Sequence, residues 1–261
     1  MAEPTSRPRR RKTLLNGGLR EQGIYLLPNL FTTGALFAGF FSIVQAMSGR
    51  FEAAAVAIFV AMVMDGLDGR VARLTNTQSA FGAEYDSLSD MVSFGVAPAL
   101  VVYVWALKPM GKLGWIAAFI YCAGAALRLA RFNTKHDAGD KRWFEGLPSP
   151  AAAALLAGLV WVNHDNGVSG KDLLWDFLPM KWVAWSFTVF AGLTMVSSLR
   201  YYSGKDINLK RSVPFVVILM IVLAFVLVSS SPPEVLFALF VSYGLSGYVY
   251  WVMTRSRGGE A

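Results

Sequence analysis

The sequence is poor in cysteine, in histidine and in charge. Its 261 residues include one cysteine, Cys122, so no disulfide can form within the chain. The two histidines, His136 and His164, lack the spacing of a metal site, and we interpret both as ordinary loop residues. Only 16% of the residues are charged, which is too few for the surface of a soluble domain of this length. The shortage of charge points to the membrane.

A secretory signal is also missing. The basic segment Arg7–Lys12 is followed by the polar, glycine-containing stretch Asn16–Gly23, where a signal peptide would have an apolar region. We therefore interpret residues 1–27 as a basic cytoplasmic tail and juxtamembrane segment.

Hydrophobic residues make up 55% of the chain, and they occur in long blocks. A helix needs about 20 mostly apolar residues to cross a bilayer core. The sequence contains eight segments that approach this length, of which the fifth is the shortest: 28–48, 51–73, 87–107, 113–132, 148–163, 182–200, 213–230 and 234–253. Residues 28–253 are therefore predicted to form an all-α, polytopic membrane bundle of about eight transmembrane helices, followed by a short cytoplasmic tail at 254–261.

The distribution of basic residues supports this number of crossings. If both termini are cytoplasmic, 19 of the 24 Lys and Arg residues fall on the inner side and 5 on the outer side. A seven-span arrangement would weaken this asymmetry. The net charge of +7 then reflects topology and attraction to anionic headgroups, and no nucleic-acid module is recognisable. We expect an integral protein of the cytoplasmic membrane.

Four aspartates occur at membrane edges, where ionisable side chains are costly. Asp65 and Asp68 share a face at the end of the second segment, and Asp86 and Asp90 share a face at the start of the third. A helix dipole favours the second pair and disfavours the first. Four carboxylates brought together repel one another unless some are protonated or a cation lies between them. Oxygen-only ligands suit Mg²⁺ or Mn²⁺, and two such ions would clamp a phosphate during its transfer.

Small residues and an arginine accompany the first pair of acids. Gly69 and Ala72 leave space beside the carboxylates, and Arg73 offers a fork suited to a diphosphate. The alternative interpretation is structural, because the acids could cap helix ends or form ion pairs with Arg70 and Arg73.

The spacing of these residues resembles the signature of the CDP-alcohol phosphatidyltransferase family, D-x2-D-G-x2-A-R-x8-G-x3-D-x3-D. Every specified position is matched, by Asp65, Asp68, Gly69, Ala72, Arg73, Gly82, Asp86 and Asp90. The resemblance implies that Asp65 and Asp86 bridge two metal ions. It further implies that Asp68 binds one ion, and that Asp90 binds the other and acts as general base. The family's reaction would transfer a phosphatidyl group from CDP-diacylglycerol to an alcohol, and the resemblance also suggests a homodimer.

Seven residues are predicted to bind CDP-diacylglycerol: Asn29, Thr32, Gly69, Ala72, Arg73, Ser79 and Gly82. The resemblance implies that Gly69, Arg73 and Ser79 hold the CDP part. Asn29 and Thr32, beside Pro28 on the first segment, are interpreted as further nucleotide contacts. Asn29 could equally cap the start of the first helix.

Two shorter stretches resemble the phosphatidylserine synthase branch of the family, residues 127–133 and 144–150. They imply L-serine as the acceptor, with phosphatidylserine and CMP as products. Arg128 and Arg131, with Asn133 beside them, could present donors to a serine carboxylate or a lipid phosphate. The two arginines could instead snorkel at the membrane edge and set the topology. Ser149 is interpreted as a helix start and not as a nucleophile, because no base is tied to it.

Two other functions fit parts of the pattern. The acceptor could be glycerol 3-phosphate or an inositol phosphate, for which Lys135, Lys141 and Arg142 could supply a basic pocket. The acids could also form an ion path in a transporter. They gather at the cytoplasmic edge, however, and no inverted repeat is apparent.

Overall fold

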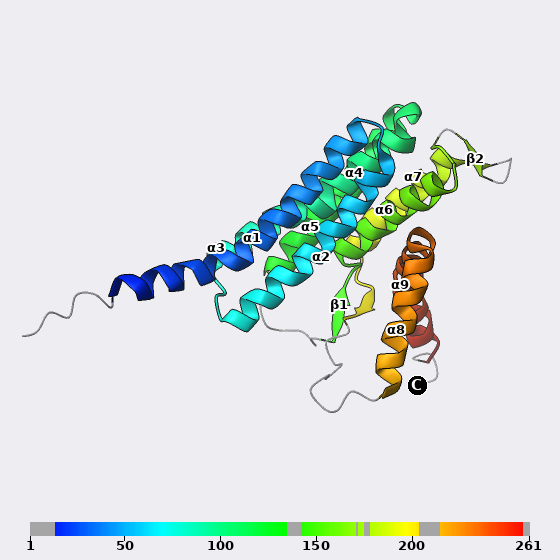
Figure 1. Cartoon of the computed structure of the whole chain (residues 1–261). Helices are drawn as coiled ribbons and strands as arrows, with labels where there is room; N and C mark the ends of the chain where they lie inside the picture. Colours follow the sequence, from blue (N-terminus) through cyan, green and yellow to red (C-terminus); the bar gives the residue numbers. More distant parts are fainter. Residues whose placement is uncertain (1–13, 135–141, 171, 175–177, 204–214, 258–261) are drawn as a thin grey trace, which may run out of the picture.

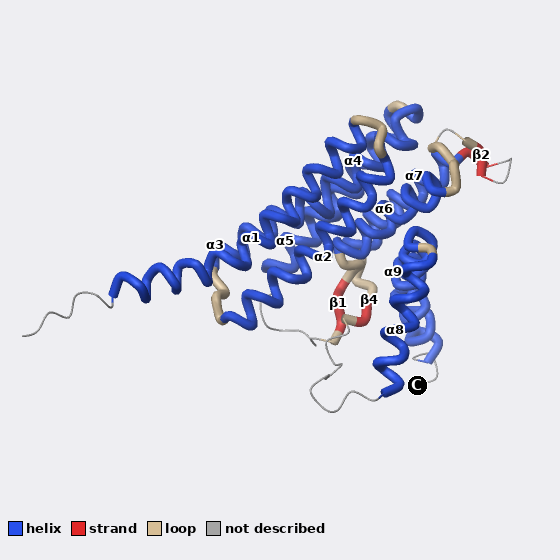
Figure 2. The backbone as a smooth tube through the Cα atoms, viewed as in Figure 1, coloured by secondary structure: helices blue, strands red, loops and turns tan. Residues whose placement is uncertain are grey.

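The structure is a computed structural model that describes residues 14–134, 142–170, 172–174, 178–203 and 215–257. Helices dominate this part of the chain (Figures 1 and 2). In chain order they are α1 (Leu14–Met47), α2 (Phe51–Thr75), α3 (Ala80–Asp90), the π-helical turn η1 (Met91–Val96), α4 (Ala97–Val102), the π-helical turn η2 (Tyr103–Leu107), the 3₁₀ turn η3 (Lys108–Met110), α5 (Lys112–Thr134), α6 (Ser149–Asp165), α7 (Met180–Val196), α8 (Phe215–Ser230) and α9 (Pro232–Arg257).

Each of the eight predicted apolar segments overlaps with a helix or with a run of consecutive helices. Four helical stretches are long and apolar enough to cross a membrane, namely Leu27–Met47, Ala80–Met110, Lys112–Thr134 and Pro232–Ser256, and a shorter apolar helix covers Met180–Val196. The architecture therefore agrees with a polytopic helical membrane protein. The number of eight crossings and the orientation of the termini stay predictions.

The centre of the bundle is α6, in which every residue from Ala151 to Val160 is buried. Alanines and a glycine fill most of this stretch, so neighbouring helices approach α6 closely. The contact between α5 and α7 is also tight, because a Cβ added at Gly124 would lie 2.4 Å from the Gly192 carbonyl oxygen. Small side chains thus determine the distances between the central helices.

The helical stretch from Ala80 to Met110 is held to α1 by buried serine hydroxyls. Ser89 donates to the Thr32 carbonyl oxygen at 3.1 Å, and Ser93 donates to that of Ala35 at 3.0 Å. From α5, the fully buried Tyr121 hydroxyl donates to the Phe94 carbonyl oxygen, inside η1, at 2.8 Å. These bonds fix the position of the stretch relative to its neighbours.

Two short antiparallel ribbons occur that the all-α prediction did not include. β1 (Trp143–Glu145) pairs with β4 (Arg200–Tyr202), and β2 (Leu173–Leu174) pairs with β3 (Leu178–Pro179). The first ribbon joins the segments that precede α6 and follow α7. It is anchored by the buried Tyr201 of β4, whose hydroxyl donates to the Gly244 carbonyl oxygen in α9 at 2.9 Å.

Two helix starts differ from the prediction. α1 begins at Leu14, so part of the predicted tail at 1–27 is helical and its N-terminal end projects away from the bundle (Figure 1). α3 begins at Ala80, because the Ser79 hydroxyl caps it by accepting a hydrogen bond from the Gly82 backbone N–H. The placement of Asp86 and Asp90 at a helix N-terminus was therefore wrong. Both lie beyond the first turn, where the dipole has little effect.

Candidate active site

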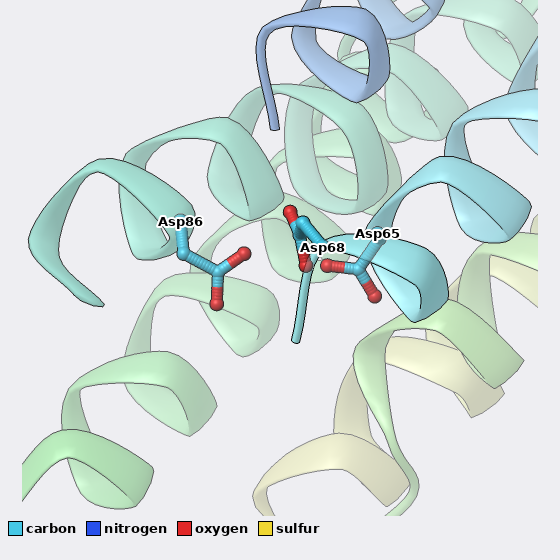
Figure 3. A group of neighbouring side chains, drawn as sticks. All are labelled: Asp65, Asp68 and Asp86. Carbon is cyan, nitrogen blue, oxygen red and sulfur yellow. The ribbon is translucent and has the colours of Figure 1, made fainter. Parts of the chain in front are cut away.

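Three of the four predicted metal ligands converge between α2 and α3. One carboxylate oxygen from each of Asp65, Asp68 and Asp86 lies within 4.8 Å of the others. Figure 3 shows these side chains pointing toward one another from the two helices. The carboxyl group of the fourth acid, Asp90, lies beside that of Asp65. The two pairs recognised by their helical spacing therefore form one cluster of acids.

The protein compensates this negative charge only in part. Two carboxylates about 4 Å apart repel by roughly 4 kcal/mol near a protein surface. Asp68 accepts a hydrogen bond from Thr32, but Asp86 Oδ1 is buried and has no hydrogen-bond partner among the described residues. Within the same part of the chain, neither Arg70 nor Arg73 forms an ion pair with these acids. The ion pairs of the structural alternative are therefore absent from the described part of the chain.

The donor set fits a hard divalent ion. It consists of carboxylate oxygens, the ligands that Mg²⁺ and Mn²⁺ prefer. A cation beside the unpartnered Asp86 Oδ1 would satisfy that oxygen and reduce the mutual repulsion. The three converging acids could hold such an ion, and Asp90 lies close enough to Asp65 to contribute to the same centre.

A cavity of about 310 Å³ opens beside the acids, between α1, α2 and α3. Asp68 and Asp86 form part of its wall. The wall also includes all seven residues predicted to bind CDP-diacylglycerol, which are Asn29, Thr32, Gly69, Ala72, Arg73, Ser79 and Gly82. These seven residues, which are up to 53 positions apart in the sequence, thus surround one space that is continuous with the acid cluster.

The turn between α2 and α3 shapes one side of this cavity. Asn76 ends α2 in the left-handed conformation, with φ at 53°, and Ser79 then caps α3. A Cβ at Gly82 would lie 3.1 Å from the Ser79 hydroxyl oxygen and 3.5 Å from Asn29 Oδ1. A larger residue at position 82 would therefore push against the α3 cap and against α1.

Asn29 and Thr32, the two predicted nucleotide contacts of α1, have surroundings that differ from the prediction. Asn29 lies well inside α1, so the interpretation of Asn29 as a helix-start cap was wrong. Thr32 is buried, and its hydroxyl donates to Asp68 Oδ2 at 2.7 Å and lies 3.2 Å from the Pro28 carbonyl oxygen. Thr32 therefore orients an acid directly, besides lining the cavity.

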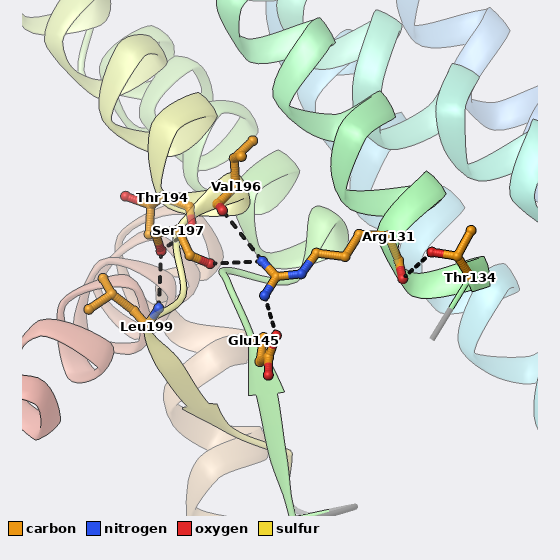
Figure 4. A network of polar contacts seen from close by, with 7 residues as sticks. All are labelled: Arg131, Thr134, Glu145, Thr194, Val196, Ser197 and Leu199. Atoms are coloured by element: carbon orange, nitrogen blue, oxygen red, sulfur yellow. Dashed lines mark hydrogen bonds and ion pairs between the residues drawn. The ribbon is translucent and has the colours of Figure 1, made fainter. Parts of the chain in front are cut away.

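The residues predicted to bind the acceptor contact different parts of the structure. Arg131 forms an ion pair with Glu145 of β1 and donates to the carbonyl oxygens of Val196 and Ser197, which end α7 (Figure 4). Asn133 donates to the Ser87 hydroxyl of α3 at 2.9 Å. Both side chains connect elements of the bundle.

Arg128 differs from both, because it lies near Asp90 and donates to the buried Ser149 hydroxyl at 2.9 Å. Of the other residues considered, His164 is exposed at the end of α6. Lys135, His136 and Lys141 lie outside the described residues.

Sequence reasoning missed several residues of the cavity wall and one partner. Thr77 and Gln78 line the cavity from the variable stretch of the signature, which specifies no residue type there. Glu145, the partner of Arg131, lies in a stretch noted only for its resemblance to one branch of the family. Thr77 and Gln78 lie in the short turn between the two helices that carry the acids. This position could have identified them as residues of the cavity wall.

Comparison with known proteins gives a consistent result. The sequence profile of the CDP-alcohol phosphatidyltransferase family matches residues 25–196. A CDP-diacylglycerol–serine O-phosphatidyltransferase of Helicobacter pylori is 37% identical over 229 residues, which cover 88% of this chain and 92% of the relative. A protein of the same name from Mycobacterium tuberculosis is 37% identical over 183 residues, covering 68% of this chain and 63% of the relative. One from Methanocaldococcus jannaschii is 41% identical over 144 residues, covering 55% and 61%. The chain therefore belongs to the CDP-alcohol phosphatidyltransferase family, as its signature residues predicted.

Proposed function

We propose that this protein transfers the phosphatidyl group of CDP-diacylglycerol to L-serine, giving phosphatidylserine and CMP. The observation that carries the proposal is the junction of the acid cluster with a cavity lined by all seven residues predicted to bind the nucleotide lipid. The choice of serine rests on the names of the relatives, which align with up to 88% of this chain.

In this proposal, Asp65, Asp68, Asp86 and Asp90 hold two divalent ions, Mg²⁺ or Mn²⁺. When bound, such ions neutralise the charge that develops on the transferred phosphate. Thr32 orients Asp68 through its 2.7 Å hydrogen bond. Asn29, Gly69, Ala72, Ser79 and Gly82 shape the space for the CDP part.

The chemical step needs a base and a bound leaving group. Asp90 accepts the proton of the serine hydroxyl. The serine oxygen then forms a bond to the lipid-bearing phosphorus, and the bond between that phosphorus and CMP breaks. Arg73 at the rim of the cavity binds diphosphate oxygens through its planar fork.

We further propose the following topology. The segment 28–253 crosses the cytoplasmic membrane eight times, with the tails 1–27 and 254–261 in the cytoplasm. The acids and the cavity then face the cytoplasm, where CDP and serine are available, and the acyl chains remain in the bilayer. The chain acts as a homodimer.

The test is an acceptor screen with the purified full-length protein. CDP-diacylglycerol is incubated with L-serine, glycerol 3-phosphate or an inositol phosphate, with and without a chelator, and CMP release and the lipid product are measured. We expect metal-dependent phosphatidylserine formation. If CMP is released only with glycerol 3-phosphate, the assignment of serine as the acceptor is refuted. If no acceptor leads to CMP release, the alternative function as an ion-coupled transporter is favoured.

A further inference from the structure

The helical stretch that carries Asp90 changes its winding directly after that residue. α3 ends at Asp90, and the π-helical turn η1 begins at Met91. At the end of η1, the Ala97 backbone N–H donates to the carbonyl oxygen of Val92, five residues earlier, whereas an α-helix would use the residue four earlier. Such wider turns inside helices are frequent at functional sites. The residue proposed as the base therefore lies at the junction of two helical registers.

Pro98 accounts for the loss of the α-helical register at this point. In a continuous α-helix, the N–H of residue 98 would donate to the Phe94 carbonyl oxygen, but proline has no N–H and its ring crowds that carbonyl group. The Tyr121 hydroxyl of α5 donates to this oxygen at 2.8 Å. Phe94 and Tyr121 are both fully buried, where a carbonyl group without a donor would be costly. Tyr121 thus supplies the donor that Pro98 lacks.

Close packing on two sides holds η1 in this conformation. Toward α1, a Cβ added at Gly39 would lie 2.5 Å from the Ser93 hydroxyl oxygen. Toward α5, a Cβ added at Gly95 would lie 3.2 Å from the Cβ of Ala125. The turn is therefore confined between α1 and α5, the helices that carry Thr32 and Tyr121.

The register of η1 determines where the Asp90 carboxyl group points. One residue of an α-helix corresponds to about 100° of rotation and about 1.5 Å of rise. Asp90 lies beside Asp65 in the present register, and α4 is buried along most of its length. If η1 became α-helical while α4 kept its packing, α3 would rotate by on the order of 100°. Asp90 would then turn away from Asp65.

We infer that Tyr121 is a positioning residue for Asp90. By completing the π-helical turn, its hydroxyl holds Asp90 in the rotation that directs the carboxyl group at the acid cluster. The inference rests on the proposed function, in which Asp90 is a metal ligand and the general base. Tyr121 also interacts electrostatically with Arg128, and the experiment separates an effect on Asp90 from an effect on Arg128.

The experiment compares Tyr121→Phe with a matched control, Tyr201→Phe, in the full-length protein. Tyr201 is also fully buried, and its hydroxyl donates to the Gly244 carbonyl oxygen at 2.9 Å. Each substitution removes one buried hydroxyl that bonds to the backbone, so both should lower the melting temperature by similar amounts. In Tyr121→Phe, kcat should fall by about 10- to 100-fold, with unchanged KM values for serine and CDP-diacylglycerol. In Tyr201→Phe, kcat should stay unchanged.

A second readout is independent of turnover. Binding of Mn²⁺ alone is measured by titration, with the electron paramagnetic resonance signal of free Mn²⁺ as the signal. The Kd for Mn²⁺ should rise about tenfold in Tyr121→Phe, because a rotated Asp90 no longer contributes its carboxylate to the centre. The Kd should stay the same in Tyr201→Phe.

The double variant Tyr121→Phe/Pro98→Ala separates geometry from stability. Alanine at position 98 returns an N–H that can donate to the Phe94 carbonyl oxygen in the α-helical register. The melting temperature should therefore recover. The turnover should stay low, because that hydrogen bond favours the register that turns Asp90 away.

Three results would contradict the inference while leaving the proposed function intact. One is an equal loss of kcat in Tyr121→Phe and Tyr201→Phe. Another is a kcat that recovers together with the melting temperature in the double variant, which would make Tyr121 a merely structural residue. The third is a higher KM for serine with an unchanged kcat, which would place the effect of Tyr121 at Arg128.

Failure of the proposed function would be recognised separately. A wild-type protein that makes no phosphatidylserine would refute that function before any variant is compared. The Mn²⁺ titration would then still test the inference, because an equal Kd in the wild type and in Tyr121→Phe would overturn the positioning of Asp90 by Tyr121.

Discussion

Two polar regions of the molecule differ in whether their charged side chains are paired with groups of opposite charge. Around Arg131, charged and polar groups from α5, β1 and α7 are paired with one another (Figure 4). Around Asp65, Asp68 and Asp86, carboxylates face carboxylates, and a buried oxygen of Asp86 has no partner in the described residues. A paired network stabilises the bundle, whereas unpaired groups require a ligand. The contrast separates structural polar residues from binding residues.

The strongest test of this contrast is removal of divalent ions. Stripping the protein with EDTA should abolish phosphatidylserine formation and lower the melting temperature, because the repelling acids lose their counter-ions. Added Mn²⁺ or Mg²⁺ should restore both. The double variant Asp65→Asn/Asp86→Asn is the control, and its melting temperature should not respond to EDTA. Full activity in the stripped protein would refute the metal centre.

Asp90→Asn should reduce kcat by at least about a hundredfold, because the amide cannot accept the serine proton. The fold should be spared, since the substitution keeps the shape and removes one charge from the cluster. Turnover and the melting temperature are measured together. Glu84→Gln, exposed on the same helix, is the control and should keep normal turnover. Substantial activity in Asp90→Asn would disprove the assignment of the base.

Thr32→Val tests the hydrogen bond that Asp68 receives from the Thr32 hydroxyl. The substitution keeps the volume but removes the donor to Asp68, so the Mn²⁺ concentration for half-maximal activity should rise about tenfold. Thr33→Val, one residue along α1, removes a hydroxyl that lies away from Asp68 and should change this concentration less than about twofold. Equal effects of the two variants would count against a positioning role for Thr32.

Arg131→Gln should have the smallest effect, and it should be an effect on stability. The loss of the partly exposed ion pair with Glu145 should lower the unfolding free energy by about 1 kcal/mol, or about 2–4 °C in melting temperature. The KM for serine should stay unchanged. A rise in that KM with unaltered stability would place Arg131 in the acceptor site and erase the difference between the two regions.

Much of this organisation could be predicted from local pattern. Long apolar blocks predicted the helices, and spacings of three and four residues placed Asp65 with Asp68 and Asp86 with Asp90 on shared faces. The start of α3 could not be predicted in this way. It depends on the Ser79 cap, which follows Asn76 in the left-handed backbone conformation. These residues are polar, so apolar periodicity gives no information about them.

The fate of the arginines shows where sequence reasoning ends. Arg128 and Arg131 are three residues apart on one helix, and both were predicted to bind the acceptor. Their partners, Ser149, Glu145 and the end of α7, come from elements that follow later in the chain. Which arginine is paired depends on how α6, β1 and α7 pack against α5, and no local pattern contains that information.

The sequence by itself determined the class of the protein, its helices and the identity of the acids, because hydropathy and helical periodicity are local properties of the chain. Only the tertiary structure decided that α1, α2 and α3 enclose a cavity beside those acids. It also decided that, among the described residues, Asp86 Oδ1 and Arg128 Nε are buried without a hydrogen-bond partner, with Arg128 lying near Asp90. Such differences arise from packing between distant helices, which sets the partners available to each polar group.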